Sequence, residues 1–136
     1  MKRLLLGLML LMTATAASAE WTRVGDTGGG TDDFIKYVDR VTIQRSGNFV
    51  KIWDLSDFKT VQKSAFAVGN SYFSSKTQRE FDCKEKRFRA LVLTWFDGQM
   101  GNGKVVYSSS ETNVKWSPIE SGSIGEAMFM IACGKK

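Results

Sequence analysis

The fold is decided by residues 71–83, which read SYFSSKTQREFDC. Two kinds of side chain alternate along this stretch, and a period of two is typical of a β-strand with one buried face. The residues of the apolar face are Phe73, Ser75, Thr77, Phe81 and Cys83. Arg79 falls on the same face, although its side chain is charged. The pattern predicts a strand that carries Cys83 on its inward side.

Five further segments outside this stretch are rich in the β-branched and aromatic residues that favour strands. They are Trp21–Val24, Phe34–Val38, Phe49–Phe58, Phe88–Phe96 and Lys104–Ser109. Turn-forming residues separate them, among them Ser46-Gly47-Asn48 and the glycine-rich segment 97–103. The polar segment 59–70 is interpreted as a link between strands. Phe88–Phe96 is apolar on both faces, which predicts a place near the middle of the sheet.

The hydrophobic period changes near the C-terminus, where a helix is expected. Ser123 stands three residues before Glu126, the spacing of a capping box, in which both side chains bind free backbone N–H groups at a helix start. The apolar residues that follow at helical spacing are Ile124, Ala127, Met128 and Ile131. Gly134 is typical of a helix end. These signals predict one C-terminal helix.

The first nineteen residues have the three parts of a secretory signal peptide. Lys2 and Arg3 precede the apolar run 4–12, and Ala17-Ser18-Ala19 fits the pattern that signal peptidase accepts. We therefore expect residues 1–19 to be removed and residues 20–136 to form a single mature domain. The apolar run is too short for a permanent membrane span, and no cysteine adjoins the cleavage site. Neither a membrane span nor a lipid anchor is expected.

Cys83 and Cys133 are the two cysteines of the chain. In an exported protein, a pair so far apart in sequence favours a disulfide, and the alternatives are a redox pair or two metal ligands. Neither cysteine belongs to a C-x-x-C motif, and the chain has no histidine that could complete a zinc site. We predict an α+β fold: an antiparallel sheet of about six strands, with one C-terminal helix packed on it and tied by a disulfide.

The sequence offers few groups for catalysis. Without histidine there is no Ser-His or Cys-His nucleophile. The tightest carboxylate pairs, Asp32–Asp33 and Asp54/Asp57, are interpreted as solvated turn residues rather than as a general acid and base. We predict that the protein is not an enzyme and that it has no catalytic residues, no cofactor and no metal site.

One charged stretch stands out, the segment 84–89, which reads KEKRFR. Its four cations are Lys84, Lys86, Arg87 and Arg89. Such a local positive surface could meet an acidic protein surface or a sulfated glycan, and the alternative is a solubilising turn that blunts the sheet. Export to the cell envelope argues against nucleic acid as the partner. We therefore predict that these four cations form a partner-binding surface.

Several short strings recur together and in order in one known family. They are SSKTQ (74–78), DCKE (82–85), MGxG (100–103), VVYS (105–108), SxSIGEA (121–127) and IACG (131–134). In these strings the chain resembles the surface-adhesin protein E family from about Trp21 to Gly134. The resemblance implies a small antiparallel sheet with a C-terminal helix held by the disulfide, in agreement with the prediction from the residues, and it is consistent with a homodimer.

The resemblance leads to a functional hypothesis and an alternative. The family's namesake is a surface adhesin that engages host matrix and plasma proteins, so we expect a non-enzymatic binding module of the cell envelope with such a partner. The namesake is anchored through a lipidated cysteine, which this chain lacks. The alternative is a soluble periplasmic protein that binds a small ligand or serves in envelope stress, with no host partner. The expected location is periplasmic, with secretion or surface exposure required by the first hypothesis.

Overall fold

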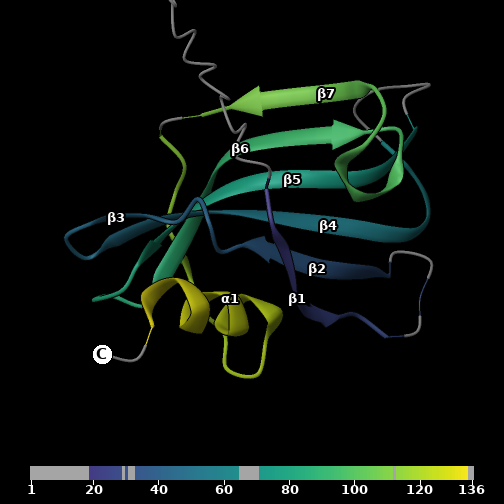
Figure 1. The fold of residues 1–136 in the computed structure, drawn as a ribbon. Coiled ribbons are helices and arrows are strands. Elements are labelled where there is room, and N and C mark those ends of the chain that lie inside the picture. Colours follow the sequence, from purple (N-terminus) through teal and green to yellow (C-terminus); the bar gives the residue numbers. More distant parts are fainter. Residues whose placement is uncertain (1–18, 29, 31–32, 65–70, 112, 135–136) are drawn as a thin grey trace, which may run out of the picture.

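The computed structural model describes residues 19–28, 30, 33–64, 71–111 and 113–134 (Figure 1). The predicted signal peptide lies outside the described residues, apart from Ala19. The described strands are β1 (Trp21–Asp26), β2 (Phe34–Asp39), β3 (Gln44–Ser46), β4 (Phe49–Lys63), β5 (Ser71–Asp82), β6 (Arg87–Phe96), β7 (Val105–Ser110) and β8 (Ser117–Pro118). A 3-10 turn, η1 (Gln99–Gly101), precedes β7, and the helix α1 (Ile124–Cys133) follows β8.

The strands form one antiparallel sheet in the order β1-β2-β4-β5-β6-β7. These six strands match the six expected from the sequence, and the prediction of an α+β fold is confirmed. Two short strands were not expected: β3 pairs with β4, and β8 pairs with β6. Each is three residues or fewer, too short for an alternation of side chains to be detected in the sequence.

On the predicted inward face of β5, Ser75, Thr77 and Phe81 are buried, and Phe73 and Cys83 are half-buried. The opposite face is not wholly exposed, because Ser74, Glu80 and Asp82 are buried too. Phe81 lies between Val50 of β4 and Phe88 of β6 in the register of the sheet. The core residues of this region are Val38, Val50, Ile52, Phe81, Met128, Phe129 and Ala132. Removing large side chains of this kind from water stabilises a fold by about 1.5–3 kcal/mol each. The core therefore joins the helix to one end of one sheet face.

The helix begins and ends where the sequence indicates. Ser123 Oγ accepts the N–H of Glu126 at 3.1 Å, and Glu126 Oε1 accepts the N–H of Gly122 at 3.3 Å. Gly134 has a φ of 67°, a conformation that glycine adopts without strain, and it follows the last turn. The buried face is rotated slightly from the expected one, since Phe129 and Ala132 are buried together with Met128.

A disulfide joins Cys83, which directly follows β5, to Cys133 at the end of α1. The Sγ–Sγ distance is 2.11 Å and the Cα atoms are 5.6 Å apart, so the predicted pairing is confirmed. The bond closes a separation of 50 residues. In Figure 1, the β3–β4 turn and the C-terminus of α1 lie at one end of the sheet, and η1 and the start of β7 lie at the other.

Two expectations about the strands need correction. The segment 59–70 is not wholly a link, because β4 continues to Lys63 and pairs Gln62 with Tyr72 beyond a bulge; residues 65–70 lie outside the described part. The strand Phe88–Phe96 is second from the edge of the sheet, and all its residues are half-buried. The strands with the most buried residues are β4 and β5, and most of the buried residues of β5 are polar.

Candidate functional site

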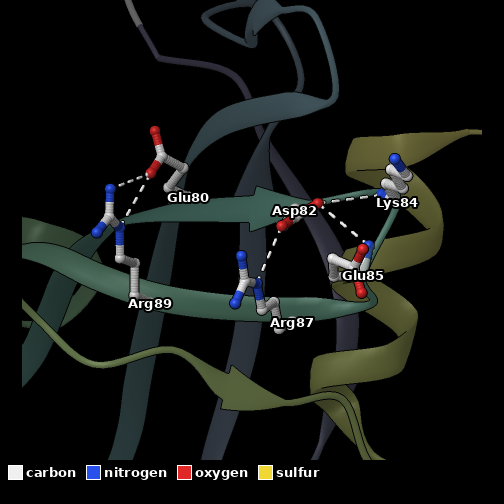
Figure 2. A network of polar contacts seen from close by, with 6 residues as sticks. All are labelled: Glu80, Asp82, Lys84, Glu85, Arg87 and Arg89. Atoms are coloured by element: carbon white, nitrogen blue, oxygen red, sulfur yellow. Dashed lines mark hydrogen bonds and ion pairs between the residues drawn. The ribbon is translucent and has the colours of Figure 1, made fainter.

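The turn between β5 and β6 carries the four cations that the sequence singles out, and Asp82 shapes this turn. The Asp82 carboxylate accepts the backbone N–H groups of Lys84 and Glu85 at 3.2 and 3.1 Å and the Nε–H of Arg87 at 2.9 Å (Figure 2). Lys86 has a φ of 50°, so the turn passes through the left-handed region at this residue. One buried carboxylate thus holds the backbone of the whole turn.

Arg87 and Arg89 are committed to contacts within the protein. Arg89 donates from Nε and Nη2 to Glu80 Oε1 at 3.0 and 2.7 Å, and Arg87 pairs with Asp82, as Figure 2 shows. Both guanidinium groups also lie over the ring of Trp116, at 4.7 Å for Arg87 and 4.3 Å for Arg89. The side chain of Arg87 is 39% exposed, and that of Arg89 is 25% exposed. Their charge is therefore largely compensated.

The ionisation of Asp82 is coupled to this turn. Burial by itself raises the pKa of Asp82, but the hydrogen bonds from Glu85 and Arg87, the charge of Arg87 and the bond from Lys84 outweigh it, so the pKa lies below its ordinary value of 3.8. A carboxyl group whose pKa is lower in the folded state contributes stability above its unfolded pKa. That contribution is lost as the pH falls through the folded pKa.

Asp82→Asn should therefore destabilise the protein at neutral pH, by about 1–3 kcal/mol, because hydrogen bonds to a charged acceptor are lost. The difference from wild type should shrink once the pH falls below about 3.8, where the unfolded carboxyl group is protonated. Urea unfolding at pH 7 and at pH 2.5 measures both effects. A difference that stays constant across this range would contradict the assigned role of Asp82.

Lys84 and Lys86 differ from the two arginines, since their side chains are exposed. Neither ammonium group forms an ion pair with another residue of the described ranges. Both lysines line a pocket of about 450 Å³ together with Arg45 of β3. The structure thus divides the four predicted cations into two pairs: Arg87 and Arg89 on the sheet, and Lys84 and Lys86 at the pocket.

Arg45 is a site residue that sequence reasoning missed. Its Nη1 donates to the backbone carbonyl of Ala132 at 2.6 Å, across 87 residues of sequence. The signal that could have found it is the pairing of β4 with β5, because two antiparallel strands bring the turn before β4 beside the turn after β5. The N–H of Cys83 donates to the carbonyl of Asn48 at 2.8 Å, which joins these two turns.

A second cluster of charged side chains lies within the sheet and consists of Lys36, Asp54 and Arg79. Lys36 Nζ is 2.8 Å from Asp54 Oδ1, and Arg79 Nε is 2.5 Å from Asp54 Oδ2. Lys36 Nζ also donates to Ser56 Oγ at 2.6 Å. Burial lowers the pKa of Lys36, with Arg79 adding to the effect and Asp54 opposing it. This group explains why Arg79 departs from the apolar pattern of β5.

The interpretation of Asp54 and Asp57 as solvated turn residues is wrong. Asp54 is 0% exposed and lies in β4, where Lys36 and Arg79 neutralise it. Asp57 is half-buried and accepts the N–H of Met100 at 2.7 Å, which fixes η1 against the sheet. The two carboxylates thus have separate structural partners. Of the other predicted pair, Asp32 lies outside the described residues.

Five aromatic rings form a row across the sheet, one from each of β2, β4, β5, β6 and β7. They are Phe34, Phe58, Tyr72, Trp95 and Tyr107. Neighbouring ring centroids in this row lie 4.3–5.6 Å apart, distances typical of stabilising aromatic pairs. Their pairing across adjacent strands reinforces the end of the sheet opposite the disulfide.

Two further observations on the described ranges concern metal binding and membrane-spanning helices. No three or more histidine, cysteine, aspartate or glutamate side chains in them are grouped so as to hold a metal ion. No helix in the same ranges is long and apolar enough to cross a membrane. The arrangement at the β5–β6 turn suits the attraction of an anion, since fixed backbone and free ammonium groups occur together there.

Comparison with known proteins gives one family and several structures. The model of the family described as surface-adhesin protein E matches residues 21–134. No curated protein matches the chain in sequence. A solved structure of Haemophilus influenzae protein E has a TM-score of 0.57 at 10% identity, covering 82% of this chain and 83% of that one. Its selenomethionine form has a TM-score of 0.55 at 12% identity, with 80% and 94% covered. A structure of protein E from non-typeable Haemophilus influenzae has a TM-score of 0.56 at 10% identity, with 87% and 79% covered.

Proposed function

The chain belongs to the surface-adhesin protein E family, and from this premise we propose that it is a non-enzymatic binding protein of the cell envelope with a host matrix or plasma protein, or a sulfated glycan, as its partner. Its contact surface is the β5–β6 turn. Lys84 and Lys86 make the main charge contacts, while Arg87 and Arg89, paired with Asp82 and Glu80, contribute less.

The single observation that carries this proposal is the contrast between the two pairs of cations. A charge already paired with a carboxylate contributes little to a partner, because its field is compensated. Lys84 and Lys86 are exposed and form no ion pair with a described residue. Asp82 holds the turn that carries them. Since the backbone is fixed, binding orders fewer groups and costs less conformational entropy.

We expect binding to a matrix or plasma protein to weaken steeply with salt. Attraction between exposed charges is screened over about 10 Å at 0.1 M salt and about 3 Å at 1 M. Lys84→Gln/Lys86→Gln should reduce binding of the mature protein to immobilised basement-membrane extract or plasma proteins at least fivefold at 0.1 M salt. The loss should disappear at 1 M, and surface plasmon resonance measures both values.

A matched control comes from the opposite end of the sheet. Lys63 and Lys104 are exposed, and Lys63→Gln/Lys104→Gln removes the same charge. This variant should bind within about twofold of wild type if the location of the charge matters. Equal losses in the two double variants would show that only net charge acts, and the proposed contact surface would then be wrong.

Location separates this function from the periplasmic alternative. A surface adhesin must be reached by protease added to intact cells, whereas a periplasmic protein is cut after the outer membrane is opened. We expect cleavage on intact cells, detected as loss of the full-length band. Protection on intact cells, together with no binding to matrix or plasma proteins, would favour a periplasmic protein without a host partner.

A further inference from the structure

We propose that the pocket between the β3–β4 turn and the β5–β6 turn binds a sulfate group of a sulfated glycan. This inference rests on the proposed binding function and names the partner class for the same end of the molecule. The cations that carry it are Arg45, Lys84 and Lys86. Only two of them belong to the basic stretch of the sequence.

The pocket is formed by parts of the fold that are fixed to one another. The two turns are joined by the hydrogen bond from the Cys83 N–H to the Asn48 carbonyl. The Cys83–Cys133 disulfide and the bond from Arg45 to Ala132 then attach both turns to the end of α1. The volume, about 450 Å³, falls within the range of sites that hold small molecules or single sugar units.

The lining of the pocket carries charge of one sign. Three cations contribute to it, and no aspartate or glutamate of the described chain is among the lining residues. Glu85, between the two lysines in sequence, is exposed and does not line the pocket. Arg45 uses Nη1 for Ala132 and has further N–H donors on its guanidinium group. An anion with several acceptor oxygens is therefore the complementary ligand.

The apolar part of the pocket lining favours a glycan over an acidic polypeptide. Val50, Phe129 and the two disulfide-bonded cysteines line the pocket together with the cations. A sulfated sugar presents both the anionic oxygens and the carbon face of a ring, so it can contact the cations and the apolar lining together. A carboxylate side chain reaching from a broad protein surface supplies the charge alone. The geometry thus fits a sulfated monosaccharide unit within a longer chain.

The test measures mature wild-type protein against four probes by isothermal titration. The probes are heparin, chemically desulfated heparin, hyaluronan and polyglutamate. We expect binding to heparin and at least a tenfold weaker interaction with the other three, which carry carboxylates without sulfate. Lys84→Gln/Lys86→Gln should lower heparin affinity at least tenfold, and adding Arg45→Gln should lower it further. Lys63→Gln/Lys104→Gln should leave it within about twofold.

The salt dependence provides a second reading. Heparin is a linear polyanion, so each bound cation releases condensed counterions, as on nucleic acids. The logarithm of the binding constant therefore falls by about 0.7–0.9 per contact for each tenfold rise in salt. In the variant Arg45→Gln/Lys84→Gln/Lys86→Gln, the magnitude of this slope should therefore be smaller by about 2–3. The double lysine variant keeps the test valid if Arg45→Gln disturbs the helix, because its lysines are exposed and make no side-chain ion pair with a described residue.

The outcomes separate this inference from the proposed function. If polyglutamate binds as well as heparin, with the same losses in the variants, the pocket takes acidic polypeptide and the sulfate assignment is overturned. If heparin does not bind but basement-membrane extract or plasma proteins do, the sulfate assignment fails and the proposed function stands. If the wild-type protein binds none of these materials, both fail.

Discussion

Asp54→Ala should destabilise the protein by about 3–5 kcal/mol, the range found when one member of a buried ion pair is removed. Asp54 has no exposed surface, and it is the carboxylate shared by Lys36 and Arg79. Without it, the two cations would face each other inside the sheet with no counter-charge. Lys36 is 5% exposed, so its ammonium group has little contact with water that could replace the lost carboxylate.

The sign of the pH dependence follows from Lys36. Its pKa in the folded protein lies below the ordinary 10.5, so between these two values the unfolded chain binds more protons and the folded state becomes more stable as the pH rises. Asp54 is the partner that raises the pKa of Lys36. In Asp54→Ala the pKa should fall further, and the destabilisation should lessen from pH 7 towards pH 10.

Urea unfolding of the variant at several pH values measures both effects, and a second variant tests the cause. Replacing all three residues with apolar ones, Lys36→Met/Asp54→Leu/Arg79→Met, removes every charge at once and should cost much less than Asp54→Ala alone. If Asp54→Ala lowered the free energy of unfolding by less than about 1 kcal/mol, water would already reach these charges in the folded protein.

Removing the disulfide is the second large effect. Cys83→Ala/Cys133→Ala should lower the free energy of unfolding by about 4 kcal/mol, from the entropy of an unfolded chain no longer closed across 50 residues. The folded state should also loosen near α1, because the contacts that still hold this helix among the described residues are its packing on the core and the Arg45 bond to Ala132. We expect amide hydrogen exchange to accelerate first in α1 and much less in β4 and β5.

The control for this variant is the single substitution Ile124→Ala, which weakens the packing of the first turn of the same helix while leaving the disulfide in place. It should destabilise the protein without a selective gain of exchange at the last turn of α1. If the double cysteine variant unfolds at the same urea concentration as wild type, the disulfide does not stabilise the fold, and the location of the helix depends on packing alone.

Local rules were sufficient for much of this fold. Ser123 and Glu126 mark the helix start by chemistry that acts within one turn, and Gly47 marks the β3–β4 turn by a φ of 61°. The alternation around Phe81 placed Cys83 on the correct side of the sheet. Each of these signals depends on neighbours within a few residues, which is why the sequence alone reveals it.

The features that were missed depend on distant partners. Asp54 is buried because Lys36 and Arg79, 18 and 25 residues away, neutralise it, and no local pattern encodes such an encounter. The extension of β4 to Lys63 depends on pairing with β5. At the candidate site, the lysines were visible as a run of charge, but Arg45 joins them only through the register of two hairpins.

The bond between Cys83 and Cys133 also has a mechanical consequence. A partner attached to the β5–β6 turn and dragged by flowing fluid would pull on Lys84, the residue directly after Cys83. The tension would divide there, with one part running along the hydrogen bonds of β5 and the other passing through the two sulfur atoms into α1. The turn cannot peel away from the sheet unless the helix leaves with it. The disulfide, which links residues 50 apart in sequence, thus provides a covalent connection next to the residue on which an adhesive partner would pull.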